Sequence, residues 1–264
     1  MKQDISEHVD KMGQPITTFG VKEFSRPVTD VERHVEEIKF AGYTVLEDLM
    51  SEDELISART RVERIYHRQI EEIGGRQYLE TIGDTYTAMC LLGYDDYFLN
   101  VATKPRVLAI VETLLGDYFT LMLQNGIINV PNIGDDQTAG LWHRDLGYQH
   151  LVTSRPLGIT ALFCLDEFSD ETGATRVLPA SHKAEPFPSD EYVRDHQSTV
   201  EARAGSAIIL DAMLYHRSGS NSSGQVRRAI NNIYTLPLIK QQISLPRVLN
   251  GRHREDSFLR RISR

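Results

Sequence analysis

Trp142-His143-Arg144-Asp145 is the stretch from which this chain can be interpreted, together with a second histidine, His216, that follows a β-rich segment. Two imidazoles and one carboxylate can hold Fe(II) on one side and leave its other side open. On a β-strand, residues two apart point to the same face, so His143 and Asp145 can bind one ion without bending the backbone, while Arg144 points away. The sequence therefore predicts a metal site made of His143, Asp145 and His216.

A candidate carboxylate-binding group follows the second histidine. Arg227 lies eleven residues after His216, in the run Val226-Arg227-Arg228-Ala229-Ile230. A guanidinium can bind a carboxylate through two parallel hydrogen bonds, which a metal site alone would not require. Because neighbouring strand residues point to opposite faces, only one of the two arginines can enter the interior. A metal site with a carboxylate anchor predicts an oxygenase that uses a keto-acid cosubstrate.

Length and composition are those of an ordinary globular chain. With 264 residues, 41% hydrophobic and 25% charged, a single domain with a helical elaboration is expected. The net charge of −8 argues against a nucleic-acid partner. Without a long apolar run or a secretory leader pattern, we expect no membrane contact and a cytoplasmic location. Cys90 and Cys164 are too few for a disulfide scaffold and are expected to be buried free thiols.

The first half of the chain carries helix signals. Residues 1–28 are interrupted by glycine and proline, and we expect an irregular N-terminal arm. Capping-box spacings predict helices that begin after Thr29 and Ser51 and end near Gly42 and by Gly74-Gly75. Between them, residues 43–46 are expected to form a short strand. Proline at the start and glycine after the end predict a third helix over 105–115.

The second half is β-rich. We expect strands within five runs, namely 118–130, 157–165, 174–178, 206–210 and 227–236. Helices followed by short antiparallel strands predict an α+β fold with a double-stranded β-helix (jelly-roll, cupin-like) core and N-terminal helices packed on one sheet. The chain then divides into the arm 1–28 and a single dioxygenase domain 29–264. Within that domain we expect a helical part over about 29–117, the jelly-roll core over about 118–237 and a C-terminal extension over 238–264.

Two segments lack a regular pattern, and the C-terminal end of the chain is rich in arginine. Residues 76–103 and 183–200 break the regular pattern with polar and aromatic side chains, and they are candidate lids over a site. The arginines of the C-terminal extension favour a solvated segment over a binding tail.

Three motifs give the sequence a resemblance to the phytanoyl-CoA dioxygenase family of Fe(II)- and 2-oxoglutarate-dependent oxygenases. They are Trp142-His143-Arg144-Asp145, Thr172-Gly173-Ala174-Thr175-Arg176-Val177-Leu178-Pro179-Ala180-Ser181-His182, and His216-Arg217-Ser218-Gly219-Ser220-Asn221 leading to Val226-Arg227-Arg228-Ala229. The motifs occur in the family's order, and the resemblance covers about residues 30–237. Thr172 stands where asparagine is common and Ala180 where glycine is common, but neither position holds the metal.

The resemblance implies a role for each site residue. His143, Asp145 and His216 would bind Fe(II) and be the catalytic residues, with 2-oxoglutarate and O₂ as cosubstrates. Arg227, rather than Arg228, would bind the distal carboxylate of 2-oxoglutarate, and Ser218 would add a hydroxyl to it.

Further polar residues lie near these motifs in the sequence. Gln124, on the strand before the metal motif, is either another cosubstrate contact or an outward-facing polar residue. Tyr148 and His150 follow the metal strand and are substrate-binding candidates. His182 belongs to a structural turn in the family and is left out of the site.

The expected activity is hydroxylation, or another C–H oxidation, of a small-molecule metabolite with release of succinate and CO₂. Asp145 favours this over halogenation, because related halogenases lose the carboxylate to admit a halide. A cupin-like metal-binding protein without redox catalysis is the alternative, against which Arg227 and Ser218 argue. Epimerisation, desaturation or cyclisation at the same site also stays open, as does the oligomeric state. No basic cluster near the metal motifs indicates a coenzyme A phosphate, which favours a free metabolite.

Overall fold

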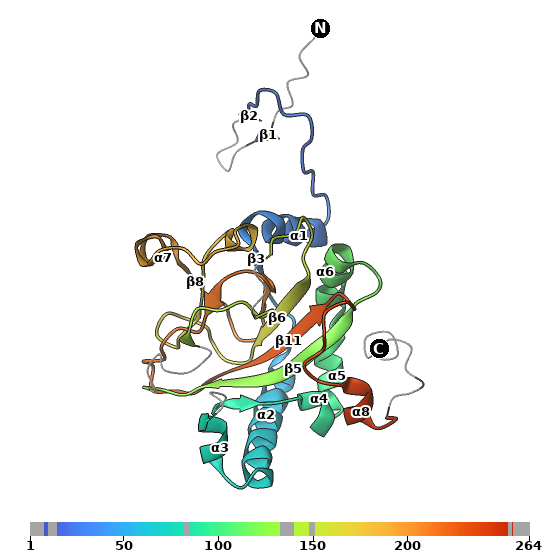
Figure 1. The fold of residues 1–264 in the computed structure, drawn as a ribbon, viewed down its shortest axis with the longest axis vertical. Coiled ribbons are helices and arrows are strands. Elements are labelled where there is room, and N and C mark those ends of the chain that lie inside the picture. Colours follow the sequence, from blue (N-terminus) through green and yellow to red (C-terminus); the bar gives the residue numbers. More distant parts are fainter. Residues whose placement is uncertain are drawn as a thin grey trace.

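The computed structural model describes residues 8–9, 15–81, 85–132, 140–147, 151–252 and 255. The N-terminal arm leads away from the rest of the protein (Figure 1). Among its described residues, β1 (His8–Val9) and β2 (Pro15–Ile16) form one short antiparallel pair, and residues 17–29 form no helix or strand. Within the described residues, no helix is long and apolar enough to cross a bilayer.

The predicted helices are present with their predicted ends. Both capping boxes form, since Thr29 and Glu32 bond each other's backbone N–H groups, and Ser51 and Glu54 do the same. The described helices are α1 (Asp30–Ala41), α2 (Glu52–Glu72), α3 (Arg76–Thr81), α4 (Leu91–Tyr94), α5 (Tyr97–Ala102), α6 (Pro105–Leu115), α7 (Asp190–His196) and α8 (Leu245–Leu249), with a 3₁₀ turn at Ser181–Lys183.

Two antiparallel sheets face each other and form the jelly roll. The larger has six strands in the order β3-β9-β6-β11-β5-β4, and the smaller has three in the order β10-β7-β8. Their bounds are β3 (Tyr43–Leu46), β4 (Thr87–Ala88), β5 (Thr120–Asn129), β6 (Gly158–Cys164), β7 (Thr175–Val177), β8 (Ser198–Val200), β9 (Ala207–Asp211), β10 (His216–Arg217) and β11 (Arg227–Thr235). A bridge between His143 and His216 adds the metal motif to the edge of the smaller sheet. The predicted α+β jelly roll is confirmed.

Strand alternation separates an interior from a helical layer. In β11, Ala229 and Ile233 pack in the clusters between the sheets. Ile230 and Tyr234, one residue along, pack with the helices on the outer face of the larger sheet. Figure 1 shows α2, α4 and α5 along that face, and α7 and β8 on the other side of the molecule. A side chain's position along a strand therefore decides whether it can reach the site between the sheets.

The described residues of the two candidate lids pack against the outer faces of the two sheets. Residues 76–103 contain β4, which pairs with the edge strand β5, and buried Leu91 and Phe98 of this segment pack in the helical layer. In 183–200, Val193 of α7 packs against Tyr215 and Trp142. These two residues alternate with the histidines His216 and His143 and so lie on the outer face of the smaller sheet. Burial of apolar side chains against a sheet explains why aromatic and apolar residues occur in both segments.

The C-terminal extension is also more structured than predicted. Leu245 and Leu249 of α8 are buried in the same core as the N-terminal helices. Arg252 then binds Asp96 at 2.8 Å and the carbonyl oxygen of Gly93 at 2.9 Å. Up to Arg252, the extension therefore packs against α4 and α5 and is not a solvated tail.

Candidate metal centre

The structure brings together the three side chains of the predicted metal site. One candidate ligand atom from each of His143, Asp145 and His216 lies within 4.8 Å of the other two. The two imidazole ring centres are 4.4 Å apart, and His216 Nε2 is 3.8 Å from Asp145 Oδ1. The backbones of the two histidines pair directly, each N–H donating to the other's carbonyl oxygen at 3.0 Å. That pairing fixes the two rings on the same side of the smaller sheet.

Backbone carbonyl groups select the histidine tautomer. His143 Nδ1 lies 2.8 Å from the carbonyl oxygen of Leu141, and His216 Nδ1 lies 3.0 Å from that of Leu214. Since a carbonyl oxygen only accepts, each Nδ1 carries a proton, and Nε2 is the nitrogen that has a free lone pair when the ring is neutral. Burial lowers the pKa of His216, which further favours the neutral ring. A neutral imidazole held in this way is the usual form of a histidine metal ligand.

Thr160 orients the carboxylate. It lies on β6, facing the interior, and its hydroxyl donates to Asp145 Oδ2. The other oxygen, Oδ1, is then the one directed towards His216. The Asp145 backbone is itself held, because its N–H donates to the carbonyl oxygen of Ala212 at 3.1 Å. The sequence alone does not indicate Thr160, because only the pairing of strands β6, β9 and β11 shows which face its hydroxyl occupies.

Arg227 forms a second polar centre inside the barrel. Its side chain is only 2% exposed, and Nη2 donates to Ser218 Oγ at 2.6 Å. The guanidinium lies over the Phe168 ring at 4.2 Å, while its buried Nε has no hydrogen-bond partner among the described residues. Burial lowers the pKa of Arg227 to about 10, so it stays charged at neutral pH. No carboxylate of the described chain lies within 4.0 Å of this cation.

The loop that carries Ser218 is fixed by close backbone contact. Gly219 donates its N–H to the carbonyl oxygen of Ala174 at 3.0 Å, and a Cβ at Gly219 would lie only 2.7 Å from that oxygen. Asn129, paired with Arg227 across the strands, donates to Ser218 Oγ at 3.1 Å. Ser218 thus stands beside the guanidinium with its hydroxyl oxygen held by two donors.

The outcome for the neighbouring polar residues follows from strand alternation. Arg228 points to the helical layer and binds Glu63 and Asp166, so it is Arg227 that enters the barrel. The prediction of a cosubstrate contact for Gln124 is wrong. Gln124 faces the helices, where its amide donates to the carbonyl oxygen of Phe98 at 2.9 Å. Tyr148 and His150 lie outside the described residues.

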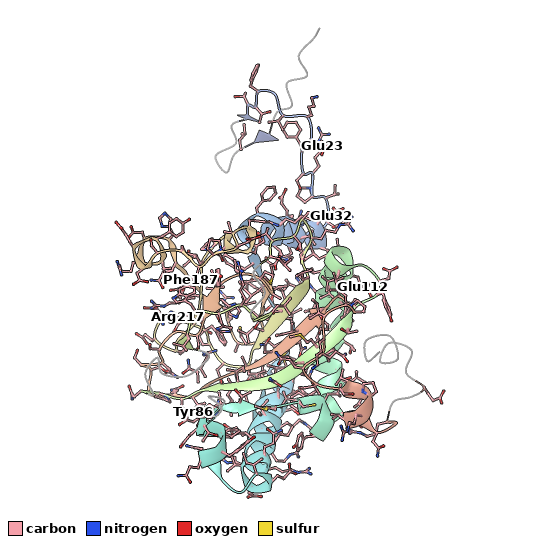
Figure 2. All side chains as sticks on the ribbon, in the orientation of Figure 1. Glu23, Glu32, Tyr86, Glu112, Phe187 and Arg217 are labelled. Carbon is pink, nitrogen blue, oxygen red and sulfur yellow. The ribbon has the colours of Figure 1, made fainter. Side chains whose placement is uncertain are left out.

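Arg144 and its neighbours brace the metal strand from the outer face. The Arg144 guanidinium donates to the carbonyl oxygens of Met213 and Ser181 and lies 4.0 Å from the centre of the Tyr215 ring. Phe187 packs edge-on to Tyr215 at 4.9 Å, and Figure 2 shows Phe187 and Arg217 on this same side of the protein. These contacts rigidify the strand that carries the ligands, but they do not enter the site.

The donor set fits both an iron ion and a keto acid. Two imidazole nitrogens and one carboxylate oxygen, gathered on one side, are the ligand type of the open facial triad of non-haem iron enzymes. A buried guanidinium without a described acid has a place for one carboxylate, because an uncompensated buried charge is costly. Both groups project between the same two sheets.

Known sequences are similar to this chain over most of its length. The family model for phytanoyl-CoA dioxygenase (PhyH) matches residues 38–229. Uncharacterized protein Rv1501 of Mycobacterium tuberculosis is 32% identical over 225 residues, which cover 84% of this chain and 81% of that protein. Dioxygenase af480 of Aspergillus fumigatus is 26% identical over 246 residues, covering 87% of this chain and 75% of that protein.

Solved structures share the fold. HygX from Streptomyces hygroscopicus, with nickel, 2-oxoglutarate and hygromycin B bound, has a TM-score of 0.59 at 18% identity, covering 83% of this chain and 92% of its own. The epimerase SnoN, in complex with Fe³⁺, alpha ketoglutarate and nogalamycin RO, has a TM-score of 0.60 at 18% identity, covering 78% and 83%. Since the family model matches most of the chain and a relative 32% identical to it covers 84% of it, this chain belongs to the phytanoyl-CoA dioxygenase family.

Proposed function

We propose that this protein is an Fe(II)- and 2-oxoglutarate-dependent dioxygenase that hydroxylates, or otherwise oxidises a C–H bond of, a small-molecule metabolite. Arg227 is the observation that carries the proposal. A buried, charged guanidinium with no described acid partner shares the barrel with the His143, Asp145 and His216 group. A metal-binding barrel without a cosubstrate has no need of such a group. This favours the oxygenase over a cupin-like metal-binding protein without redox catalysis.

Each residue has a definite task in the proposed reaction. His143, Asp145 and His216 would hold Fe(II) from one side and leave its other positions open to ligands. Bound Fe(II) and 2-oxoglutarate supply, with O₂, the oxidising chemistry, and succinate and CO₂ are the co-products. Arg227 and Ser218 would bind the distal carboxylate of the keto acid and so fix its orientation. Apolar walls, including Phe168 and Val177, would exclude water from that end.

The reaction outcome is a finer part of the proposal. SnoN is described as an epimerase and HygX was solved with hygromycin B, so proteins of this fold differ in what they do with a substrate. The retained carboxylate of Asp145 supports oxidation over halogenation. Product analysis by mass spectrometry separates the outcomes: hydroxylation adds one oxygen atom, desaturation and ring closure remove two hydrogens, and epimerisation leaves the mass unchanged.

The test begins with metal and cosubstrate binding. Anaerobically purified protein is expected to bind one Fe(II) per chain, and His143→Ala and His216→Ala are each expected to abolish binding at micromolar metal. A library of candidate metabolites is then screened for 2-oxoglutarate-dependent succinate release. Stoichiometric iron in both histidine variants would move the site away from these residues. Iron binding without any 2-oxoglutarate binding would favour the metal-binding protein.

A further inference from the structure

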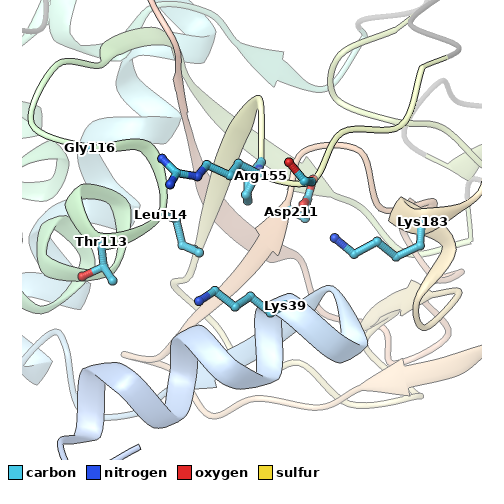
Figure 3. A pocket seen from close by; sticks show the side chains of 9 residues that line it. Lys39, Thr113, Leu114, Gly116, Arg155, Lys183 and Asp211 are labelled. Carbon is cyan, nitrogen blue, oxygen red and sulfur yellow. The ribbon is translucent and has the colours of Figure 1, made fainter. Parts of the chain in front are cut away.

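A second polar pocket lies outside the barrel, on the helical side of the larger sheet (Figure 3). It measures about 220 Å³ and is lined by the ends of α1 and α6, residues 154–156, Lys183 and Asp211. Pockets that enclose a whole small-molecule ligand usually measure about 300–1,000 Å³. The volume here suits a small ion, or one polar group of a larger molecule.

Positive charge dominates this pocket. Lys39, Arg155 and Lys183 come from three separate segments, and Figure 3 shows them around one space together with Asp211. No carboxylate of the described chain lies within 4.0 Å of their charged nitrogens. Several cations elsewhere are paired; Lys104, for example, lies 2.7 Å from Glu54. Three cations without a carboxylate partner among the described residues therefore surround one pocket, in a chain whose net charge is −8.

Asp211 does not neutralise the group. Its side chain is buried, with 4% of the residue exposed, and Oδ1 accepts a hydrogen bond from the Met213 N–H at 2.9 Å. One carboxylate can offset only one of the three positive charges, and this one is already engaged in its own turn. The pocket therefore keeps a net positive charge with Asp211 ionised.

The end of α1 does not account for Lys39 either. Cations near a helix C-terminus stabilise its free carbonyl groups, and Lys39 lies in the last turn of α1. Yet the last carbonyl oxygens of α1 already have donors, since Ala41 accepts from the Ala180 N–H at 2.8 Å and Lys39 accepts from His182 Nε2 at 3.3 Å. The Lys39 ammonium group therefore remains available to a ligand.

We propose that this pocket binds a small oxyanion, a phosphate, sulfate or carboxylate group whose charge is balanced by Lys39, Arg155 and Lys183. The pocket adjoins the metal strand: Asp211 precedes Ala212, whose carbonyl oxygen accepts from the Asp145 N–H at 3.1 Å. The anion is either a free ion or the charged end of the substrate. These three cations are far apart in the chain, so the sequence shows no basic cluster there.

Direct binding is measured first, on metal-free protein, and it does not depend on the proposed function. The full chain is titrated calorimetrically with sodium sulfate and with inorganic phosphate, at an ionic strength held constant with sodium chloride. One saturable site is expected. The double variant Lys39→Ala/Lys183→Ala should bind both anions with an affinity lower by about tenfold or more, since charge-assisted hydrogen bonds are lost. Lys22→Ala and Arg203→Ala, which remove exposed cations elsewhere, are the matched controls and should change nothing.

Asp211→Asn provides an opposite-sign test. Sulfate carries no proton at neutral pH and cannot donate a hydrogen bond to Asp211, so removing the carboxylate charge should tighten sulfate binding. A merely structural role of the residue would not strengthen it. No saturable binding of either anion up to about 10 mM, or equal affinity in wild type and the double lysine variant, would overturn the proposal. Circular dichroism and stoichiometric iron binding verify that the variants are folded.

A kinetic arm distinguishes the two sources of the anion, and this arm rests on the proposed function. If the anion is part of the substrate, the active compounds in the succinate screen carry a phosphate, sulfate or carboxylate. Sulfate then competes with these compounds, and the double lysine variant has a higher KM for them with an unchanged kcat. If the anion is a free ion, calorimetric binding persists and KM is unchanged. Failure of the screen with intact anion binding would count against the proposed oxygenase alone.

Discussion

Thr160 shows how one hydroxyl outside the ligand set controls a metal ligand. By donating to Asp145 Oδ2, it leaves Oδ1 to face His216 and the ion. Groups that hydrogen-bond to metal ligands set both the ligand's orientation and its basicity. The strength of iron binding should therefore depend on a residue that never touches the metal.

Thr160→Val keeps the side-chain volume and removes the hydroxyl. Iron affinity is expected to fall by about 10- to 100-fold, the usual effect of losing such a contact. Thr120→Val is the control, because Thr120 is equally buried but bonds Thr235 away from the metal. The measurement is anaerobic Fe(II) titration of each variant. Equal affinities in the two variants would show that Thr160 does not orient Asp145.

The two adjacent arginines of β11 offer a matched pair of variants. Arg227→Ala should raise the 2-oxoglutarate concentration required for half-saturation by about 10²- to 10³-fold, with iron still bound. The reason is that a buried pair of an arginine and a carboxylate contributes a few kcal/mol to binding. Arg228→Ala breaks contacts with Glu63 and Asp166 instead and should lower stability without changing that concentration. Anaerobic 2-oxoglutarate binding and thermal unfolding measure the two effects. The reverse pattern would place Arg228 in the barrel.

At the scale of elements, the corner between α1 and β3 supports the turn that leads to the second histidine. Gly42 ends α1 with φ 91°, and its carbonyl oxygen accepts from the Asp211 N–H at 2.8 Å. A Cβ at this glycine would lie 2.5 Å from Leu214 Cδ1 and 2.7 Å from His182 Nδ1. The position therefore requires glycine both for its backbone conformation and for the close approach of its neighbours.

Gly42→Ala is expected to lower the free energy of unfolding by about 3 kcal/mol, because left-handed strain and overpacking add together. Gly74→Ala is the control: Gly74 also has a positive φ, 81°, but no atom lies within 4 Å of the added Cβ. It should cost only about 1 kcal/mol. Urea unfolding of the metal-free proteins measures both. Similar losses at the two sites would show that the neighbours of Gly42 move aside easily.

At the scale of the whole molecule, a buried acid links stability to pH. Burial raises the pKa of Asp211 from 3.8 to about 6. The Met213 N–H, Lys183 and Arg144 act in the opposite direction but do not cancel the effect of burial. A folded-state pKa above the unfolded value means that protonation favours folding. This contribution is fully present below pH 3.8 and is lost as the pH rises through about 6.

Asp211→Asn should therefore stabilise the metal-free protein at pH 8 and change little near pH 3.5. The difference between pKa values of 3.8 and about 6 corresponds to about 3 kcal/mol. Asparagine keeps an oxygen that can accept from the Met213 N–H, so the turn is retained. Thermal unfolding measured across this pH range should show a smaller pH dependence in the variant. An identical pH profile would mean that Asp211 is solvated in the folded protein.

Local signals in the sequence determined most of the element pattern. Capping boxes, Pro105 and the glycines after each helix identify α1, α2 and α6, because the free N–H and C=O groups at helix ends are satisfied by nearby residues. The strands of the core follow from apolar β-rich runs. The short elements between residues 76 and 103 were missed, because their helices have only four to six residues and are stabilised by packing against the sheet.

The sequence by itself determined the metal group and the family, since His143, Asp145 and His216 belong to motifs readable along the chain. Only the tertiary structure decided on which face of the sheet each polar side chain lies. It turned Gln124 to the helices, Thr160 to the metal and Arg227, rather than Arg228, into the barrel. It also gathered Lys39, Arg155 and Lys183 around one pocket. The physical reason is that strand spacing sets which residues share a face, whereas strand pairing and helix packing decide which face is the interior and which distant residues meet there.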